Sequence, residues 1–277
     1  MAENTVAAIV SRLPDPDGRG LLSNIDKEVV DGVTTELLEG RGESVRAVID
    51  LLVEPGKGDD VKAHYALHCL ALRVCAMGGR AREGFSRTLA SCLGGDKPKA
   101  VQKYLIQELQ TAGGEEAVSK LGDMLLDKEL CEPAARALTA IGEGACAQFL
   151  KALGQVQGKS RLTIIQNLGV LRCDEAVEVL QEETNDESRD TRLAALWGLA
   201  NIGHVGSAEL LLKAADTKDN WERIKATKAC LLMAERLAEA GKKDAAQKIY
   251  KRLHRMCEGT EAAYVCEAAE AGLAQLK

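Results

Sequence analysis

The sequence is poor in the residues that mark most β-rich folds. Only 3% of its 277 residues are aromatic and only five are proline, while alanine, leucine, glutamate and lysine recur throughout. Small apolar residues among good helix formers favour closely packed helices over a β-sandwich. The composition therefore predicts an all-α fold, and the length is ample for a continuous core.

An excess of positive charge and long apolar runs are also missing. The net charge is −6, and no apolar run reaches the roughly 20 residues that cross a bilayer. A general nucleic-acid binder needs a basic face to displace counterions, so the acidic balance argues against a nucleic-acid partner. The first 13 residues lack a basic segment followed by an apolar stretch, so no signal peptide is predicted.

Nine cysteines are present, and no two of them form a C-x-x-C pair. Most fall at apolar positions of expected helices, where cysteine acts as a small hydrophobic residue. The pattern argues against a zinc site or a disulfide framework and predicts reduced thiols. Reduced thiols favour a cytoplasmic location, although a secreted or periplasmic protein with its signal trimmed would have the same sequence.

A repeated segment of about 30 residues is the main organising feature of the chain. Its apolar residues recur at steps of three and four, which is one face of an α-helix. The copy with the sequence RLAALWGLANIG at 192–203 has counterparts at 102–113, 131–142, 161–171 and 223–233. A weaker copy at 62–72 lies 40 residues before the next one, which predicts an insertion near Arg73–Arg82.

A second amphipathic segment lies between successive copies, at 117–126, 145–153, 176–181 and 208–214. Glycine or polar clusters separate the two segments, as at Gly142–Gly144 and Thr184–Ser188, and such residues suit helix caps. Each unit is therefore a short helical hairpin. One hairpin cannot bury its apolar face alone, so the hairpins must stack.

The copies resemble HEAT repeats of the phycobilisome-lyase-like subclass. The resemblance rests on Thr191–Gly203 followed by Ser207–Leu212, and on Pro133–Gly142 followed by Gly144–Leu150. It implies an all-α, right-handed α-solenoid of about 13–15 helices that acts as a scaffold for a protein or peptide partner. Fold does not imply function, and the alternative is an enzyme or accessory that resembles bilin lyases or DNA-base glycosylases.

The two ends of the chain differ from the repeats. Residues 1–60 predict a helical N-terminal cap and the first repeat helix, with a turn-rich stretch at Pro14–Gly20. Residues 61–235 are the HEAT-like repeats. Residues 236–277 resemble a tetratricopeptide-type helical cap that ends in a helix at Glu261–Leu276. We expect all three parts to form one continuous solenoid.

Residues suited to catalysis or metal binding are few. His64 and His68 lie at i and i+4 on one helix face, a spacing that can bind a metal, but His204 and His254 are distant in sequence. The alternative is a partly exposed helix surface. No Gly-x-Ser-x-Gly elbow or phosphate-binding glycine loop is present. We therefore predict a non-catalytic protein with no metal and no cofactor.

One position of the repeat is basic in four copies, at Lys62, Arg161, Arg192 and Arg223. These side chains could hold an acidic partner. The guanidinium fork of arginine is equally suited to acidic residues in neighbouring turns, here Asp190 or Glu222. Internal pairing is the interpretation we adopt.

Another position is polar in most copies, although the second helices of the hairpins otherwise repeat apolar residues. It is aligned with Trp197, and Leu67 occupies it in the weak copy. Together with the position one turn earlier it predicts a stripe on the concave face that binds a protein or peptide, formed by His64, Tyr104, Gln107, Arg136, Gln166, Trp197 and Lys228. The alternative is that Trp197 packs into the neighbouring repeat, because large rings are usually mostly buried.

Overall fold

The computed structural model of the protein describes residues 2–18, 25–257 and 263–276. The described residues form sixteen α-helices and no strand, so the all-α prediction is confirmed with slightly more helices than the 13–15 expected. Two of the predicted segments, Pro14–Gly20 and Glu261–Leu276, extend beyond the described residues, at residues 19, 20, 261 and 262. The α-helices are α1 (Ala2–Ser11), α2 (Lys27–Glu39), α3 (Arg41–Asp50), α4 (Val61–Met77), α5 (Gly79–Ser91), α6 (Lys99–Ala112), α7 (Glu115–Met124), α8 (Cys131–Ile141), α9 (Ala145–Leu153), α10 (Gly158–Leu171), α11 (Val177–Glu183), α12 (Arg189–Ile202), α13 (Ala208–Ala215), α14 (Asn220–Glu239), α15 (Lys243–Cys257) and α16 (Ala263–Gln275).

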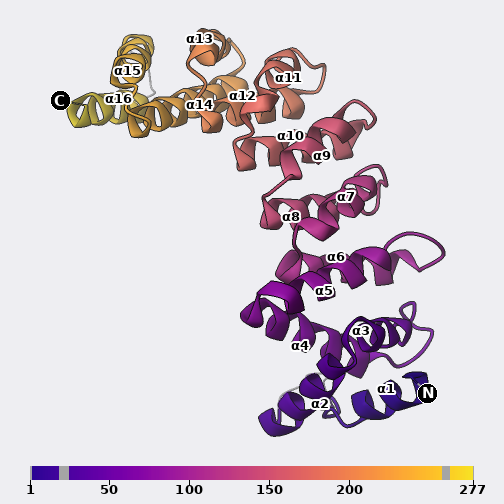
Figure 1. Cartoon of the computed structure of the whole chain (residues 1–277). Coiled ribbons are helices and arrows are strands. Elements are labelled where there is room, and N and C mark those ends of the chain that lie inside the picture. The colour runs from indigo at the N-terminus through magenta and orange to yellow at the C-terminus, as the bar shows by residue number, and fades with distance from the viewer. Residues whose placement is uncertain (1, 19–24, 258–262, 277) are drawn as a thin grey trace. The chain divides into compact units, whose positions relative to one another are not determined.

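The chain divides into two compact units, residues 1–148 and 149–277, with the boundary inside α9. In the first unit the helices stack in two layers, α1, α3, α5 and α7 in one and α2, α4, α6 and α8 in the other (Figure 1). In the second unit α10, α12 and α14 stack in a row, against which α11, α13 and α15 pack. Stacked helical hairpins of this kind form an α-solenoid.

Helix α6 illustrates why this sequence forms these layers. Its fully buried residues include Leu105, Ile106, Leu109 and Ala112, which follow the helical period and face the core. The opposite side of the helix is polar and open to solvent. Because the helices are amphipathic in this way, no helix within the described ranges is long and apolar enough to cross a membrane.

The insertion expected near Arg73–Arg82 is helical. Helices α4 and α5 have 17 and 13 residues, whereas α6 and α7 have 14 and 10. The segment contains the end of α4, the start of α5 and the turn at Gly78, whose φ of +64° favours glycine. Longer helices therefore account for part of the extra length of this repeat.

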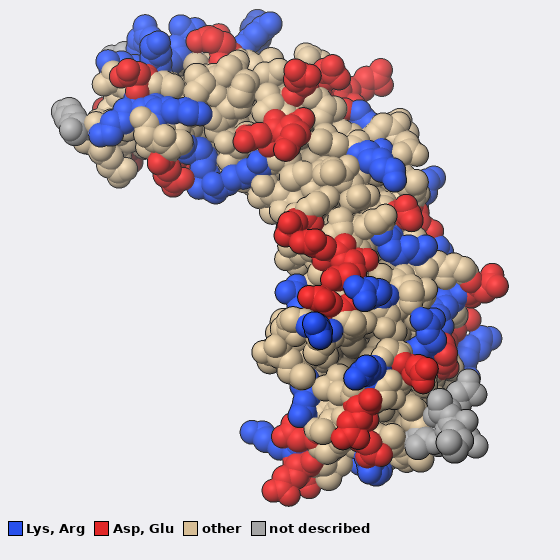
Figure 2. Space-filling model, in the orientation of Figure 1, with Lys and Arg blue, Asp and Glu red and all other residues tan. Residues whose placement is uncertain are grey.

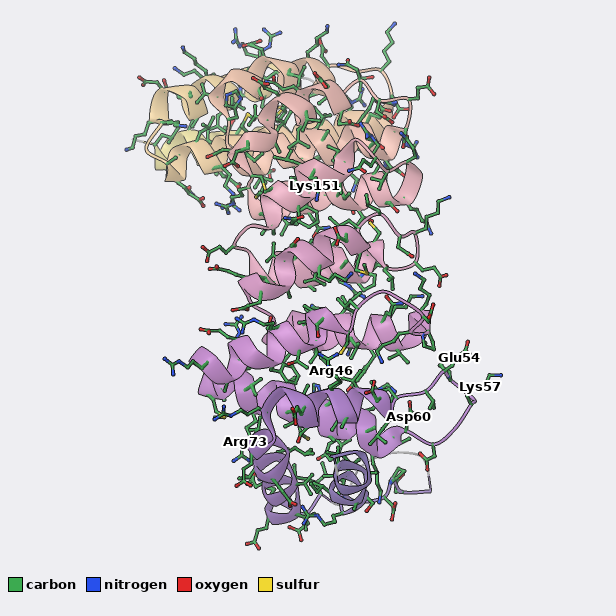
Figure 3. All side chains as sticks on the ribbon, turned by 45° about the vertical axis from the view of Figure 1, so that its right-hand side comes forward. Arg46, Glu54, Lys57, Asp60, Arg73 and Lys151 are labelled. Carbon is green, nitrogen blue, oxygen red and sulfur yellow. A yellow bond between two sulfur atoms is a disulfide. The ribbon has the colours of Figure 1, made fainter. Side chains whose placement is uncertain are left out.

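Hydrogen bonds between side chains join helices of the same layer in the first unit. Arg46 of α3 donates to Ser91 Oγ of α5 at 3.0 Å. Arg73 of α4 donates to Thr34 Oγ1 of α2 at 2.8 Å. Both arginines are labelled in Figure 3. These bonds link neighbouring hairpins in addition to the apolar contacts between them.

Cys257 at the end of α15 and Cys266 of α16 form a disulfide, with their Cα atoms 5.8 Å apart. The prediction of reduced thiols is therefore wrong for this pair, and the cysteine argument for a cytoplasmic location loses its basis. The nine-residue separation spans the connection between two helices, so no local motif marks it. Free thiols are found at Cys69, Cys75, Cys92 and Cys230.

Candidate functional site

Four residues of the predicted stripe lie on the side of α4, α6 and α8 that faces solvent, which we call the first even-helix face. His64 and Tyr104 are half-buried, and Gln107 and Arg136 are exposed. The aligned residue Leu67 is fully buried instead, and its neighbour His68 is the one that reaches solvent. The copy in α4 is separated from the next copy by the longest interval in the chain. The alignment of the repeats is therefore wrong by one residue in α4.

A hollow of about 640 Å³ lies on this face between α6 and α8, and we call it the α6/α8 groove. Three of the predicted residues line it. Its charged groups are paired with one another: Lys103 Nζ lies 3.1 Å from Glu129 Oε2, and Arg136 Nε lies 3.8 Å from Glu132 Oε1. The lining comprises Ala100, Lys103, Tyr104, Gln107, Gln110, Glu129, Glu132, Pro133 and Arg136.

Tyr104 is held in place by α4. Its hydroxyl donates to the carbonyl oxygen of His64 at 2.5 Å, and the rings of the two residues meet edge to face with centroids 4.1 Å apart. His64 is positioned in turn by Asp60, whose Oδ2 lies 3.2 Å from Nε2 of the imidazole. Burial, and next the nearby charge of Glu108, raise the pKa of Tyr104 well above its usual value. The ring is therefore a fixed, neutral wall of the groove.

A buried carboxylate lies behind this wall. The side chain of Glu108 is 1% exposed, and its two oxygens lie 3.1 and 3.2 Å from Nδ1 of His68. The sequence prediction missed this pair. One feature of the sequence could have indicated this pair: Glu108 occupies a core-facing position of α6, between Ile106 and Leu109. An acidic residue at such a position requires a partner, because a buried charge is costly when unpaired.

The two histidines of α4 are both engaged with carboxylates. His64 contacts Asp60, and His68 contacts Glu108. Among the described residues, no group of three or more His, Cys, Asp or Glu side chains is arranged to hold a metal ion. Of the two interpretations of the His64/His68 spacing, the contacts favour the partly exposed helix surface.

Cys69 is the thiol closest to this cluster in sequence. Burial raises the pKa of Cys69, and the charge of Glu108 raises it further, against a lowering contribution from its hydrogen bond with Tyr65. Since the thiolate is the nucleophile, a raised pKa makes this thiol a poor one at neutral pH.

The other three predicted residues lie on the outer side of α10, α12 and α14, which we call the second even-helix face. Gln166, Trp197 and Lys228 are all exposed. Trp197 is 38% exposed. Its ring also packs on α10, because a Cβ added to Gly169 would lie 2.9 Å from the ring atom Cζ3. Trp197 thus combines both interpretations: one face packs on a neighbouring helix and part of the ring faces solvent.

A pair of glycines allows this packing. A Cβ on Gly169 would lie only 2.7 Å from the Cα of Gly198, so α10 and α12 approach closely at this point. Glycine is required here because any side chain would meet backbone. The indole ring of Trp197 lies against Gly169 at this crossing.

Three of the four residues at the repeated basic position form ion pairs within their own unit, whereas Arg223 donates to Asn220 Oδ1 of its own helix at 2.9 Å. Arg192 forms an ion pair with Glu222, and Arg161 forms one with the buried Glu183. Lys62 Nζ lies 2.8 Å from Asp15. In each of these three pairs the cation reaches an acid on another segment of its own unit, which ties neighbouring elements together.

A comparison with protein families supports the predicted repeat. Residues 147–231 match the family of HEAT repeats, and no curated protein matches the chain. Among solved structures, an engineered protein is 18% identical over 99% of this chain and 78% of its own, with a TM-score of 0.47. The complex of CpcE and CpcF of phycocyanin lyase from Nostoc sp. PCC7120 is 16% identical over 84% of this chain and 94% of its own, with a TM-score of 0.43. The family match confirms the predicted HEAT repeats over residues 147–231.

Proposed function

We propose that the protein, whose described helices form an α-solenoid, is a non-catalytic scaffold that binds an extended segment of a partner protein in the α6/α8 groove. The observation that carries the proposal is the hollow itself. Tyr104, Gln107 and Arg136, three residues predicted to bind a partner, line it together.

The lining suits a polypeptide backbone. The amides of Gln107 and Gln110 each offer hydrogen-bond donors and an acceptor, which match the C=O and N–H groups of an extended chain. The ring of Tyr104 offers apolar contact area at low entropic cost. The cations and anions of the groove neutralise one another, so the groove does not select a strongly charged ligand.

Preorganisation supports affinity at this site. Tyr104 is fixed by its bond to the His64 carbonyl and by the imidazole against its ring. A side chain that is already ordered loses less conformational entropy when a partner binds. The network from Asp60 through His64 to Tyr104 therefore contributes to binding without contacting the partner.

The second even-helix face is a further contact surface in this proposal. Trp197 packs against Gly169 and is flanked in the repeat alignment by Gln166 and Lys228 on the neighbouring helices. A rigid, partly exposed tryptophan between polar side chains is typical of interface hot spots.

Alanine variants of the groove test the proposal against a matched pair on the other layer. Gln107→Ala with Arg136→Ala removes two exposed side chains of the groove, and Glu83→Ala with Arg87→Ala removes two exposed side chains of α5. The protein serves as bait in an extract of its source, and the Kd of each retained protein is then measured. We expect a partner whose binding weakens about tenfold for the groove variant and is unchanged for the α5 variant. Equal effects of the two variants would overturn the proposal.

A further inference from the structure

Helix α15 has one buried and one basic face. Ala246, Ile249, Tyr250, Leu253 and Cys257 are buried where α15 packs on α14 and α16. The opposite side is exposed and carries four cations at positions i, i+3, i+4 and i+7, which lie on one face of a helix and span about 10 Å. We call these residues the α15 basic stripe: Lys248, Lys251, Arg252 and Arg255. Figure 2 shows lysine and arginine side chains gathered over α15.

The described residues of its unit do not neutralise the stripe. No ion pair among the described residues involves any of its four members, although Glu270 of α16 lies nearby and pairs with His254 at 2.9 Å. Asp244, one turn before Lys248, is the acid on α15. Like charges three and four residues apart on a helix repel one another. The stripe therefore lowers the stability of an isolated α15, and an anionic partner would relieve that cost.

We propose that the α15 basic stripe binds an acidic segment of a partner protein. The inference is independent of the α6/α8 groove, because the groove is internally neutralised and the stripe carries an excess of positive charge. Four carboxylates on an extended or helical segment fit four cations that lie on one line. Complementary charge also speeds the encounter between partners.

Two other polyanions fit the stripe less well. Nucleic-acid affinity comes from many phosphate contacts, roughly 6–10 in typical complexes, whereas the stripe offers four cations, no aromatic side chain for base stacking, and acidic Asp244 and Glu270 at its margins. A helix that lies on a membrane inserts an apolar face, and the apolar face of α15 is buried against α14 and α16.

Binding of a fluorescein-labelled decaglutamate peptide to the full chain, followed by anisotropy at low salt, tests the proposal. The test variant replaces the four stripe residues with glutamine. The control variant carries Lys27→Gln, Lys57→Gln, Arg87→Gln and Lys128→Gln, which removes four exposed cations from scattered places in the first unit. Both variants lose the same charge, so only the arrangement differs. All eight side chains are exposed, and thermal melting confirms that each variant folds.

We expect the stripe variant to bind decaglutamate at least about tenfold more weakly than the wild type, and the scattered variant to change by less than about threefold. Equal weakening in both variants, or no binding by the wild type, would overturn the proposal. A DNA oligonucleotide of equal charge, or phosphatidylserine vesicles, are the competing probes. If the DNA or the vesicles bind the wild type more tightly than the peptide does, and this binding is weakened in the stripe variant, the proposal is also overturned.

Discussion

The contact between α10 and α12 at Gly169 allows a sharp test of the structure. In Gly169→Ala the new Cβ would lie 2.7 Å from the Cα of Gly198 and 2.9 Å from the Trp197 ring. Backbone cannot move aside as a flexible side chain can, so the two helices must separate, and overpacking of this kind costs about 1–3 kcal/mol. Alanine in a helix regains about 1 kcal/mol over glycine. Because the backbone contact places the cost near its upper end, we expect a net loss of about 2 kcal/mol.

Gly84→Ala is the matched control for this prediction. Gly84 also lies inside a helix, α5, but a Cβ there would meet no atom within 4 Å. The same substitution should therefore stabilise the protein by up to about 1 kcal/mol through helix propensity alone. Urea unfolding and thermal melting of both variants measure the difference, which for Gly169→Ala corresponds to a fall in Tm of about 5 °C.

The fluorescence of Trp197 gives a second readout of the same change. The chain has two tryptophans, so a Trp221→Phe background isolates the emission of Trp197. In that background Gly169→Ala should displace the ring, shift its emission to longer wavelength and increase its quenching by acrylamide. If Gly169→Ala instead stabilises the protein as Gly84→Ala does, with unchanged emission, the close approach of α10 and α12 is wrong.

Three further predictions concern charge and the disulfide. The pKa of Glu115 is raised by its hydrogen bond with Glu143 and by the charge of Glu143. Glu143→Gln should therefore raise the Tm slightly at pH 7, and this gain should vanish in acid, where Glu115 is protonated. A gain in Tm that persists at low pH would contradict this cause. The hydrogen bond from Lys99 lowers the pKa of Asp127 below 3.8, so its contribution to stability is present above that value and disappears as the pH falls through the folded-state pKa. Asp127→Asn should therefore lower the Tm at pH 7 and leave it unchanged at about pH 2, and an equal loss at both pH values would count against the ion pair. Cys257→Ser with Cys266→Ser should cost about 2 kcal/mol of stability, and peptide mapping without reductant should recover the two cysteines as one linked fragment rather than as alkylated thiols.

Periodicity made the architecture predictable, because each helix must bury one side against its neighbours. The helical period also predicted that Gln107 and Arg136 lie on an exposed face, and both side chains are exposed in the structure. The prediction failed at Leu67 because one repeat is stretched, and a change of one residue in a helix turns a side chain by about 100°.

Other features depend on contacts that sequence spacing does not reveal. The partner of Glu108 is His68, 40 residues away on another helix. Cys257 and Cys266 meet across the connection between two helices. The packing of the Trp197 ring on α10 depends on Gly169, which looks like an ordinary helix residue in the sequence. Each of these is a product of packing between helices.

The most direct test of the proposed scaffold function is photo-crosslinking from the α6/α8 groove. A photoreactive amino acid replaces Gln107 in one variant and Arg87 of α5 in another, and both positions are exposed. We predict that position 107 crosslinks to one partner protein, within a single extended segment of it, and that position 87 does not. Crosslinks to that protein from position 87 alone, or equally from both positions, would contradict it.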